Sequence, residues 1–167
     1  MKKIFLTVFT VSLILSCISK PPVVSNEVAN NEDEQLQQLL INTDVITECM
    51  ALIRPLSDSP NELIDLISAF NNTHPTIEVL KITLDVSKTL YILLNKIEHI
   101  DMDIAEYTKL CSAYINGDHS ILIADLIQQT EAILEKIDSL WPDIEALDKT
   151  VDTLHNAMQR YGFEFTP

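Results

Sequence analysis

The clearest pattern of apolar and polar positions runs through the last third of the chain. Positions that suit a buried seam recur there in steps of three and four: Ile123, Leu126, Thr130, Ile133, Ile137, Leu140, Ile144, Leu147, Val151, Leu154, Met158 and Tyr161. Such a heptad pattern predicts one long helix that packs as in a left-handed coiled coil. Pro142 removes one backbone hydrogen bond inside the repeat, and because the repeat keeps its phase, we expect a kink there.

A second helical pattern covers about 75–100 and carries two apolar rows. The rows are Val79, Ile82, Val86, Leu90, Leu93, Ile97 and Ile100, and then Ile77, Leu80, Leu84, Tyr91 and Leu94. A helix that is apolar over so much of its circumference is normally enclosed by neighbours, so we expect it at the centre of a bundle. A membrane-inserting hairpin is disfavoured, because Lys81, Asp85 and Lys88 interrupt the apolar surface.

Three further helices complete the prediction. The first begins near Glu34 and ends at Arg54-Pro55, because the residue before a proline is pushed out of helical conformation. Ser59-Pro60-Asn61-Glu62 predicts the start of the second, with the serine as N-cap. Another helix is expected over 103–115, after which Asn116-Gly117-Asp118 supplies a stop and a new N-cap. The chain is therefore predicted to be all-α, a bundle of about five helices.

The first twenty residues follow a different pattern. Lys2 and Lys3 precede a run from Ile4 to Leu15 that is interrupted only by two threonines and a serine. A short basic segment before an apolar run of this length is the layout of a secretory signal peptide. A transmembrane anchor is disfavoured, since a helix needs roughly 20 apolar residues to cross a bilayer.

The end of that apolar run, Ile14-Leu15-Ser16-Cys17, resembles the lipobox of bacterial lipoprotein precursors. The resemblance implies that the thiol of Cys17 carries diacylglycerol, that the chain is cut before it, and that the new amino terminus is acylated. Leu15 departs from the many lipoboxes that have a smaller residue there. Ile18 stands where some inner-membrane lipoproteins carry aspartate, so the resemblance favours the outer membrane. Two or three acyl chains would hold the protein durably.

We therefore divide the chain into a signal peptide (1–16), an acylated tether (17–33) and a helical-bundle domain (34–167). The 151 residues that remain after cleavage are enough for one domain with its own core. Without Lys2 and Lys3, the chain has 9 basic and 25 acidic residues, a net charge of −16. This charge excludes nucleic acid as a partner and disfavours binding to anionic headgroups, so membrane contact would come through the lipid anchor.

Cys49 and Cys111 are the thiols that remain once Cys17 is lipidated. Both lie on predicted apolar faces, and export would permit a disulfide between them. The alternative is that each is a small buried side chain. A catalytic thiol is disfavoured, because Cys49 adjoins Glu48 and the only nearby cation of Cys111 is Lys109.

Other candidate chemistry is sparse. The metal-capable groups of 98–106 match no known ligand spacing, because Glu106 stands where a calcium loop needs glycine. We interpret this segment as a solvated helix junction. The chain has no Gly-rich phosphate loop, no Gly-x-Ser-x-Gly elbow and no His-Glu-x-x-His helix. We expect no enzyme, no cofactor and no metal site.

These observations predict an exported, lipid-anchored helical bundle of the cell envelope that binds another protein. The alternative is a carrier or sensor of a small apolar molecule held between helices. Eight acidic against three basic residues between Ile121 and Tyr161 disfavour pairing of the long helix with a second copy, so we expect a monomeric soluble domain.

Overall fold

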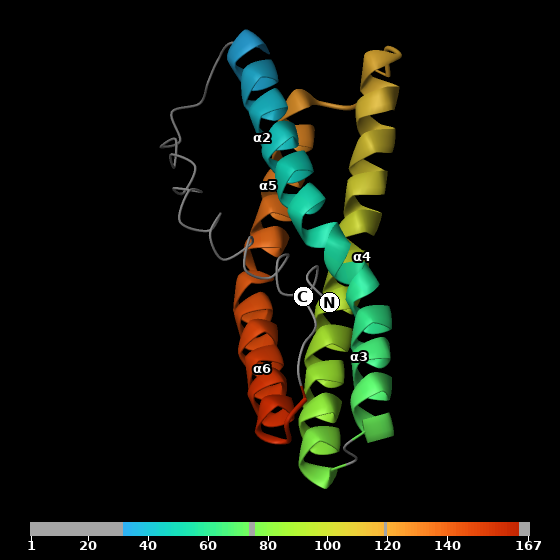
Figure 1. The fold of residues 1–167 in the computed structure, drawn as a ribbon. Coiled ribbons are helices and arrows are strands. Elements are labelled where there is room, and N and C mark those ends of the chain that lie inside the picture. The colour runs from blue at the N-terminus through green and yellow to red at the C-terminus, as the bar shows by residue number, and fades with distance from the viewer. Residues whose placement is uncertain (1–31, 74–75, 119, 164–167) are drawn as a thin grey trace.

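The computed structural model describes residues 32–73, 76–118 and 120–163 (Figure 1), and in these ranges the chain forms helices and no strand. The elements in chain order are α2 (Glu32–Ile53), the 3-10 helix η1 (Arg54–Asp58), α3 (Ser59–Thr73), α4 (Ile77–Ile115), α5 (Ile123–Asp138) and α6 (Trp141–Arg160). The predicted all-α helical bundle is confirmed.

The helices form three columns (Figure 1). One column is α2, η1 and α3, the second is α4 alone, and the third is α5 followed by α6. α5 packs against both α2 and α4, α6 packs against α4, and α3 contacts α4 and η1. The largest fully buried side chains come from all three columns: Phe70, Met50, Ile53, Leu56, Leu93, Ile100, Leu126, Ile137, Leu140, Ile144, Leu154 and Met158.

The first column is more continuous than the sequence predicted. α2 ends at Ile53, before Arg54-Pro55, as expected. The chain then continues as η1, which buries Leu56 completely. Ser59 was predicted to be the N-cap of α3, a position that has non-helical dihedrals, but its φ of −58° and ψ of −32° are already helical. The expected break is therefore a bend that keeps α2 and α3 in one column.

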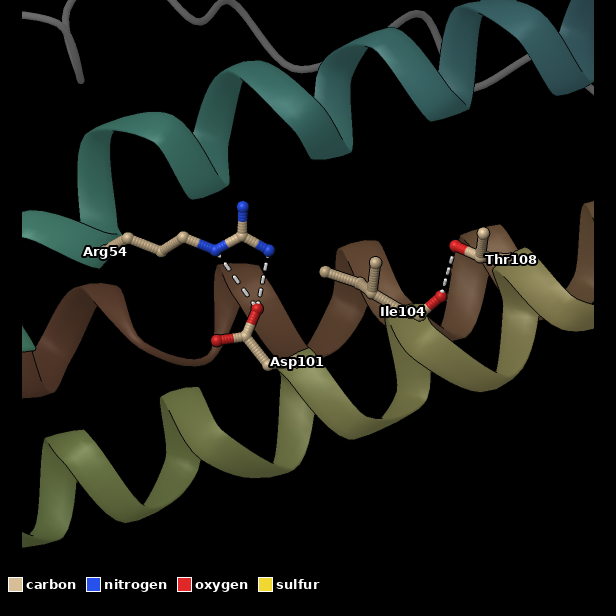
Figure 2. A network of polar contacts seen from close by, with 4 residues as sticks. All are labelled: Arg54, Asp101, Ile104 and Thr108. Atoms are coloured by element: carbon tan, nitrogen blue, oxygen red, sulfur yellow. Dashed lines mark hydrogen bonds and ion pairs between the residues drawn. The ribbon is translucent and has the colours of Figure 1, made fainter.

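α4 corrects the prediction of two helices separated at Asp101-Met102-Asp103, because it runs for 39 residues without a break. This segment contains neither proline nor glycine, and buried Ile97, Ile100 and Tyr107 continue one face across it. Two aspartates of this segment, Asp101 and Asp103, form salt bridges with the other two columns. Arg54 donates to Asp101 Oδ1 through Nε (3.2 Å) and Nη2 (2.7 Å), as Figure 2 shows. The polar cluster is the surface of a helix and not a junction.

The end of α4 follows the expected stop signal. Gly117 has a φ of +90°, a conformation that favours glycine, and its N–H bonds to the Tyr114 carbonyl at 3.0 Å. Asp118 does not cap the next helix as predicted. Its Oδ1 accepts hydrogen bonds from the backbone N–H and the hydroxyl of Ser120, and α5 begins only at Ile123. The aspartate thus stabilises the turn.

The third column bends ahead of Pro142, which supports the predicted kink. α5 and α6 are separated by Ser139 and Leu140, both of which keep right-handed helical dihedrals. The Leu140 N–H donates a hydrogen bond to the Ile137 carbonyl at 3.0 Å, and Pro142 has no N–H to donate. Ten positions of the predicted seam are buried on both sides of the bend: Ile123, Leu126, Thr130, Ile133, Ile137, Leu140, Ile144, Leu147, Leu154 and Met158.

Candidate functional site

Cys17, the predicted lipidation site, lies outside the described residues, and so do the signal peptide and nearly all of the tether. Lipidation therefore stays a prediction. Among the helices in the described ranges, none combines the length and the apolar character needed to cross a bilayer.

Cys49 and Cys111 are free thiols in the structure and not a disulfide. Cys49 is buried on α2, and Cys111 is half-buried on α4. Contacts from Thr43 to Tyr107 and from Arg54 to Asp101 fix how α2 and α4 run past each other. Both side chains belong to the apolar core of the bundle, Cys49 as a buried member and Cys111 as a partly buried one, which agrees with the alternative of small buried side chains.

The surroundings of the thiols do not suit nucleophilic chemistry. Burial raises the pKa of Cys49, and the negative charges of Asp138 and Glu48 raise it further. Near Cys111, the hydroxyls of Thr43 and Tyr107 lie 2.7 Å apart. Burial and a hydrogen bond with Cys111 raise the pKa of Tyr107 to about 12, so this phenol stays neutral at physiological pH. A nucleophilic cysteine needs a cationic neighbour that stabilises its thiolate, and neither position has one in these contacts.

The acidic segment 98–106 forms part of the exposed and half-buried surface of α4. His99 bonds through Nδ1 to the Asn95 carbonyl of its own helix at 2.6 Å. Within the described part of the chain, no three His, Cys, Asp or Glu side chains are grouped closely enough to hold a metal ion.

A shallow depression of about 140 Å³ lies between α4 and α5. Its lining includes Asp103, Glu106, Gln129 and Lys136. Sites for small apolar molecules are usually about 300–1,000 Å³ and lined mainly by apolar side chains. This depression is smaller than such sites, and it does not by itself support the alternative of an apolar-ligand carrier.

Salt bridges hold α4 against the third column in one register. Lys136 pairs with Asp103 at 2.6 Å, Lys96 pairs with Asp143, and Arg160 pairs with Glu78 at 2.6 Å. In each pair the two residue numbers add to nearly the same total, as expected for antiparallel helices in a single alignment. The bend before Pro142 therefore does not shift α6 relative to α4.

The Arg160 contact belongs to a small cluster at the end of α6. Tyr161 donates to Glu78 Oε2 at 2.8 Å, and this bond, together with Arg160, lowers the pKa of Glu78. The ring of Tyr161 meets Phe70 of α3 edge to face, and Phe163 meets Phe70 in the same way. This cluster joins the ends of α3, α4 and α6.

One apolar surface is left open on α4, contrary to the prediction that neighbours enclose this helix. The first apolar row is largely buried, but four members of the second are exposed: Ile77 by 73%, Leu80 by 47%, Leu84 by 56% and Tyr91 by 73%. We call these four residues the outer α4 stripe. The sequence showed the second apolar row but gave no sign that it would face solvent. Apolar periodicity shows which side of a helix is apolar, but it carries no information on how many helices pack around it.

Searches against protein-family models, curated proteins and solved structures find no match to this chain. Functional inference therefore rests on its sequence and its structure alone.

Proposed function

We propose that the protein is an exported bacterial lipoprotein, held in the cell envelope by acyl chains on Cys17, whose helical domain binds another protein. The observation that carries the proposal is the signal sequence that ends in Ile14-Leu15-Ser16-Cys17. An outer-membrane location is favoured by Ile18 after the acylated cysteine.

The shape of the domain suits this role. α4 has 39 residues and is therefore about 58 Å long. The tether joins the domain at the start of α2, whereas α3 passes into α4 at the opposite end (Figure 1). A chain anchored through Cys17 would thus carry the α3–α4 end away from the membrane. The outer α4 stripe gives such a domain an apolar surface for a partner.

Replacement of Cys17 by Ala tests the anchor. We expect the variant to lose its incorporated fatty acid and to leave the membrane fraction or remain uncleaved, because the thiol is the proposed attachment point. The measurements are metabolic labelling with an alkyne fatty acid, intact mass, and membrane fractionation. Cys111→Ala is the matched control and should behave as the natural protein does. Unchanged mass and unchanged fractionation of Cys17→Ala would refute the anchor.

A further inference from the structure

The outer α4 stripe has the spacing of a helix-binding surface. Ile77, Leu80, Leu84 and Tyr91 follow one flank of α4 over four turns, or roughly 21 Å. Partner helices commonly bind such surfaces through apolar side chains spaced three, four and seven residues apart. An exposed tyrosine among aliphatic side chains is also typical of residues that dominate binding.

Lysines border the stripe, although the protein as a whole is strongly acidic. Lys81 and Lys88 are seven residues apart and lie beside Leu84 on the helix surface. Lys81 has no salt bridge within the described ranges, and Lys88 has only a 3.8 Å contact with Asp85 of its own helix, where both side chains are about two-thirds exposed. Such a contact contributes little. Both ammonium groups are therefore open to carboxylates of a partner.

Four other basic residues of the described chain are already engaged between columns. Arg54, Lys96, Lys136 and Arg160 each pair with a carboxylate of another column. Lys81 and Lys88, which border the open apolar surface, take no part in these contacts between columns. The charge beside the stripe thus complements an acidic partner.

We propose that the outer α4 stripe binds an amphipathic helix of a partner protein, with the apolar seam of that helix on the stripe and its acidic flank beside Lys81 and Lys88. This inference rests on the proposed function and deepens it, because it names the binding surface and the chemistry of the partner. A partner helix of about four turns matches the length of the stripe.

A second copy of this chain fits the surface less well. The antiparallel arrangement that places Ile77 opposite Tyr91, and Leu84 opposite Leu84, brings Lys81 of one copy beside Lys88 of the other. Like charges that face each other across a helix pair are unfavourable.

Site-specific photo-crosslinking in the native cells tests the proposal on the full chain. A photoreactive amino acid replaces Leu84, and the same replacement at Ile115, which is 80% exposed at the other end of α4, is the control. We expect Leu84 and not Ile115 to crosslink to a protein segment with helical apolar spacing and Asp or Glu on its flank, identified by mass spectrometry of the joined peptides. A crosslink to a second copy, to lipid, to a basic segment or to nothing would overturn the proposal.

Charge reversal tests the role of the lysines. With the photoreactive residue at position 84, the double change Lys81→Glu and Lys88→Glu should lower the crosslinking yield by about tenfold, because two attractions become repulsions. Lys149→Glu on α6 changes a lysine that forms no salt bridge within the described part of the chain, and it should leave the yield unchanged. Equal circular dichroism spectra would show that all variants are folded. An equal yield for the double variant would overturn the assigned chemistry.

The failures of the two proposals can be told apart. Unchanged mass and unchanged membrane fractionation of Cys17→Ala, together with an intact Leu84 crosslink, would refute only the lipid anchor. Crosslinking from exposed Thr153 of α6 but not from Leu84 would keep a protein-binding function and overturn the stripe as its site. Every variant is therefore scored for both membrane fractionation and crosslinking.

Discussion

The Cys49 thiol is buried on α2, and its environment keeps it protonated. Burial is the main cause of its raised pKa, and Asp138 and Glu48 add to the effect. Cys111 is also free but is only half-buried. Alkylating reagents react with the thiolate, so the raised pKa of Cys49 slows its reaction, and its burial also limits access of the reagent.

We therefore expect two free thiols in denatured, unreduced protein, and in the native protein Cys111 should be alkylated well before Cys49. Mass spectrometry after timed alkylation with iodoacetamide at pH 8 measures both quantities. The reaction of Cys49 should accelerate as the pH rises. Cys49→Ala and Cys111→Ala assign the two phases. A count of zero thiols would show that a disulfide forms after all.

At the scale of elements, a buried polar contact fixes how α2 lies against α5. Asn42 donates from Nδ2 to the Thr130 hydroxyl at 2.9 Å, and both side chains are buried. Asn42 also accepts from Gln38, and the Thr130 hydroxyl donates to the Ile127 carbonyl at 2.7 Å. The Asn42 Nδ2 group thus keeps its Thr130 acceptor only while the two helices keep this alignment. Buried polar pairs of this kind can specify helix register.

Thr130→Val should destabilise the domain by about 1–3 kcal/mol, because the isosteric change leaves a buried amide N–H of Asn42 without its acceptor. Adding Asn42→Leu should recover most of that loss, since neither partner then needs a hydrogen bond. Urea unfolding of the chain from Ile18 onward, arranged as a double-mutant cycle, measures the coupling.

The matched control for this cycle is Thr108→Val on exposed α4 surface, where the hydroxyl bonds only to the Ile104 carbonyl of its own helix (Figure 2). It should change the free energy of unfolding by less than about 0.5 kcal/mol. Additive effects of the Asn42 and Thr130 changes would contradict the proposed coupling.

At the scale of the whole molecule, the heptad seam of the last third of the chain is used internally. Leu126 and Ile137 of α5 and Leu154 and Met158 of α6 are almost completely buried within one chain. Two carboxylates on α4 and α6, Asp103 and Asp143, are paired with lysines of the facing column. Little of the seam is left for a second copy.

We therefore expect the chain from Ile18 onward to sediment as a monomer at modest concentration and low salt, where repulsion between its acidic surfaces is strongest. Sedimentation velocity measures this directly, and a repeat at high salt separates charge repulsion from the absence of an interface. A tight dimer that persists at low salt would show that an interface between copies exists.

The sequence by itself determined the all-α class and several of the helix ends. Steps of three and four residues, the end of α2 before Arg54-Pro55, and the stop at Asn116-Gly117 depend on local backbone chemistry, which neighbouring residues fix. The bend ahead of Pro142 could be predicted for the same reason, because proline lacks the N–H that would complete a hydrogen bond within its own helix.

Only the tertiary structure decided what the helices face. Asp101 and Asp103 looked like a break, but they sit within one helix where they reach Arg54 and Lys136 from other columns. The free state of Cys49 and Cys111 and the exposure of the outer α4 stripe depend on how the helices of the described residues are arranged. Periodicity shows which side of a helix is apolar, but the number and alignment of neighbouring helices decide which apolar side is covered.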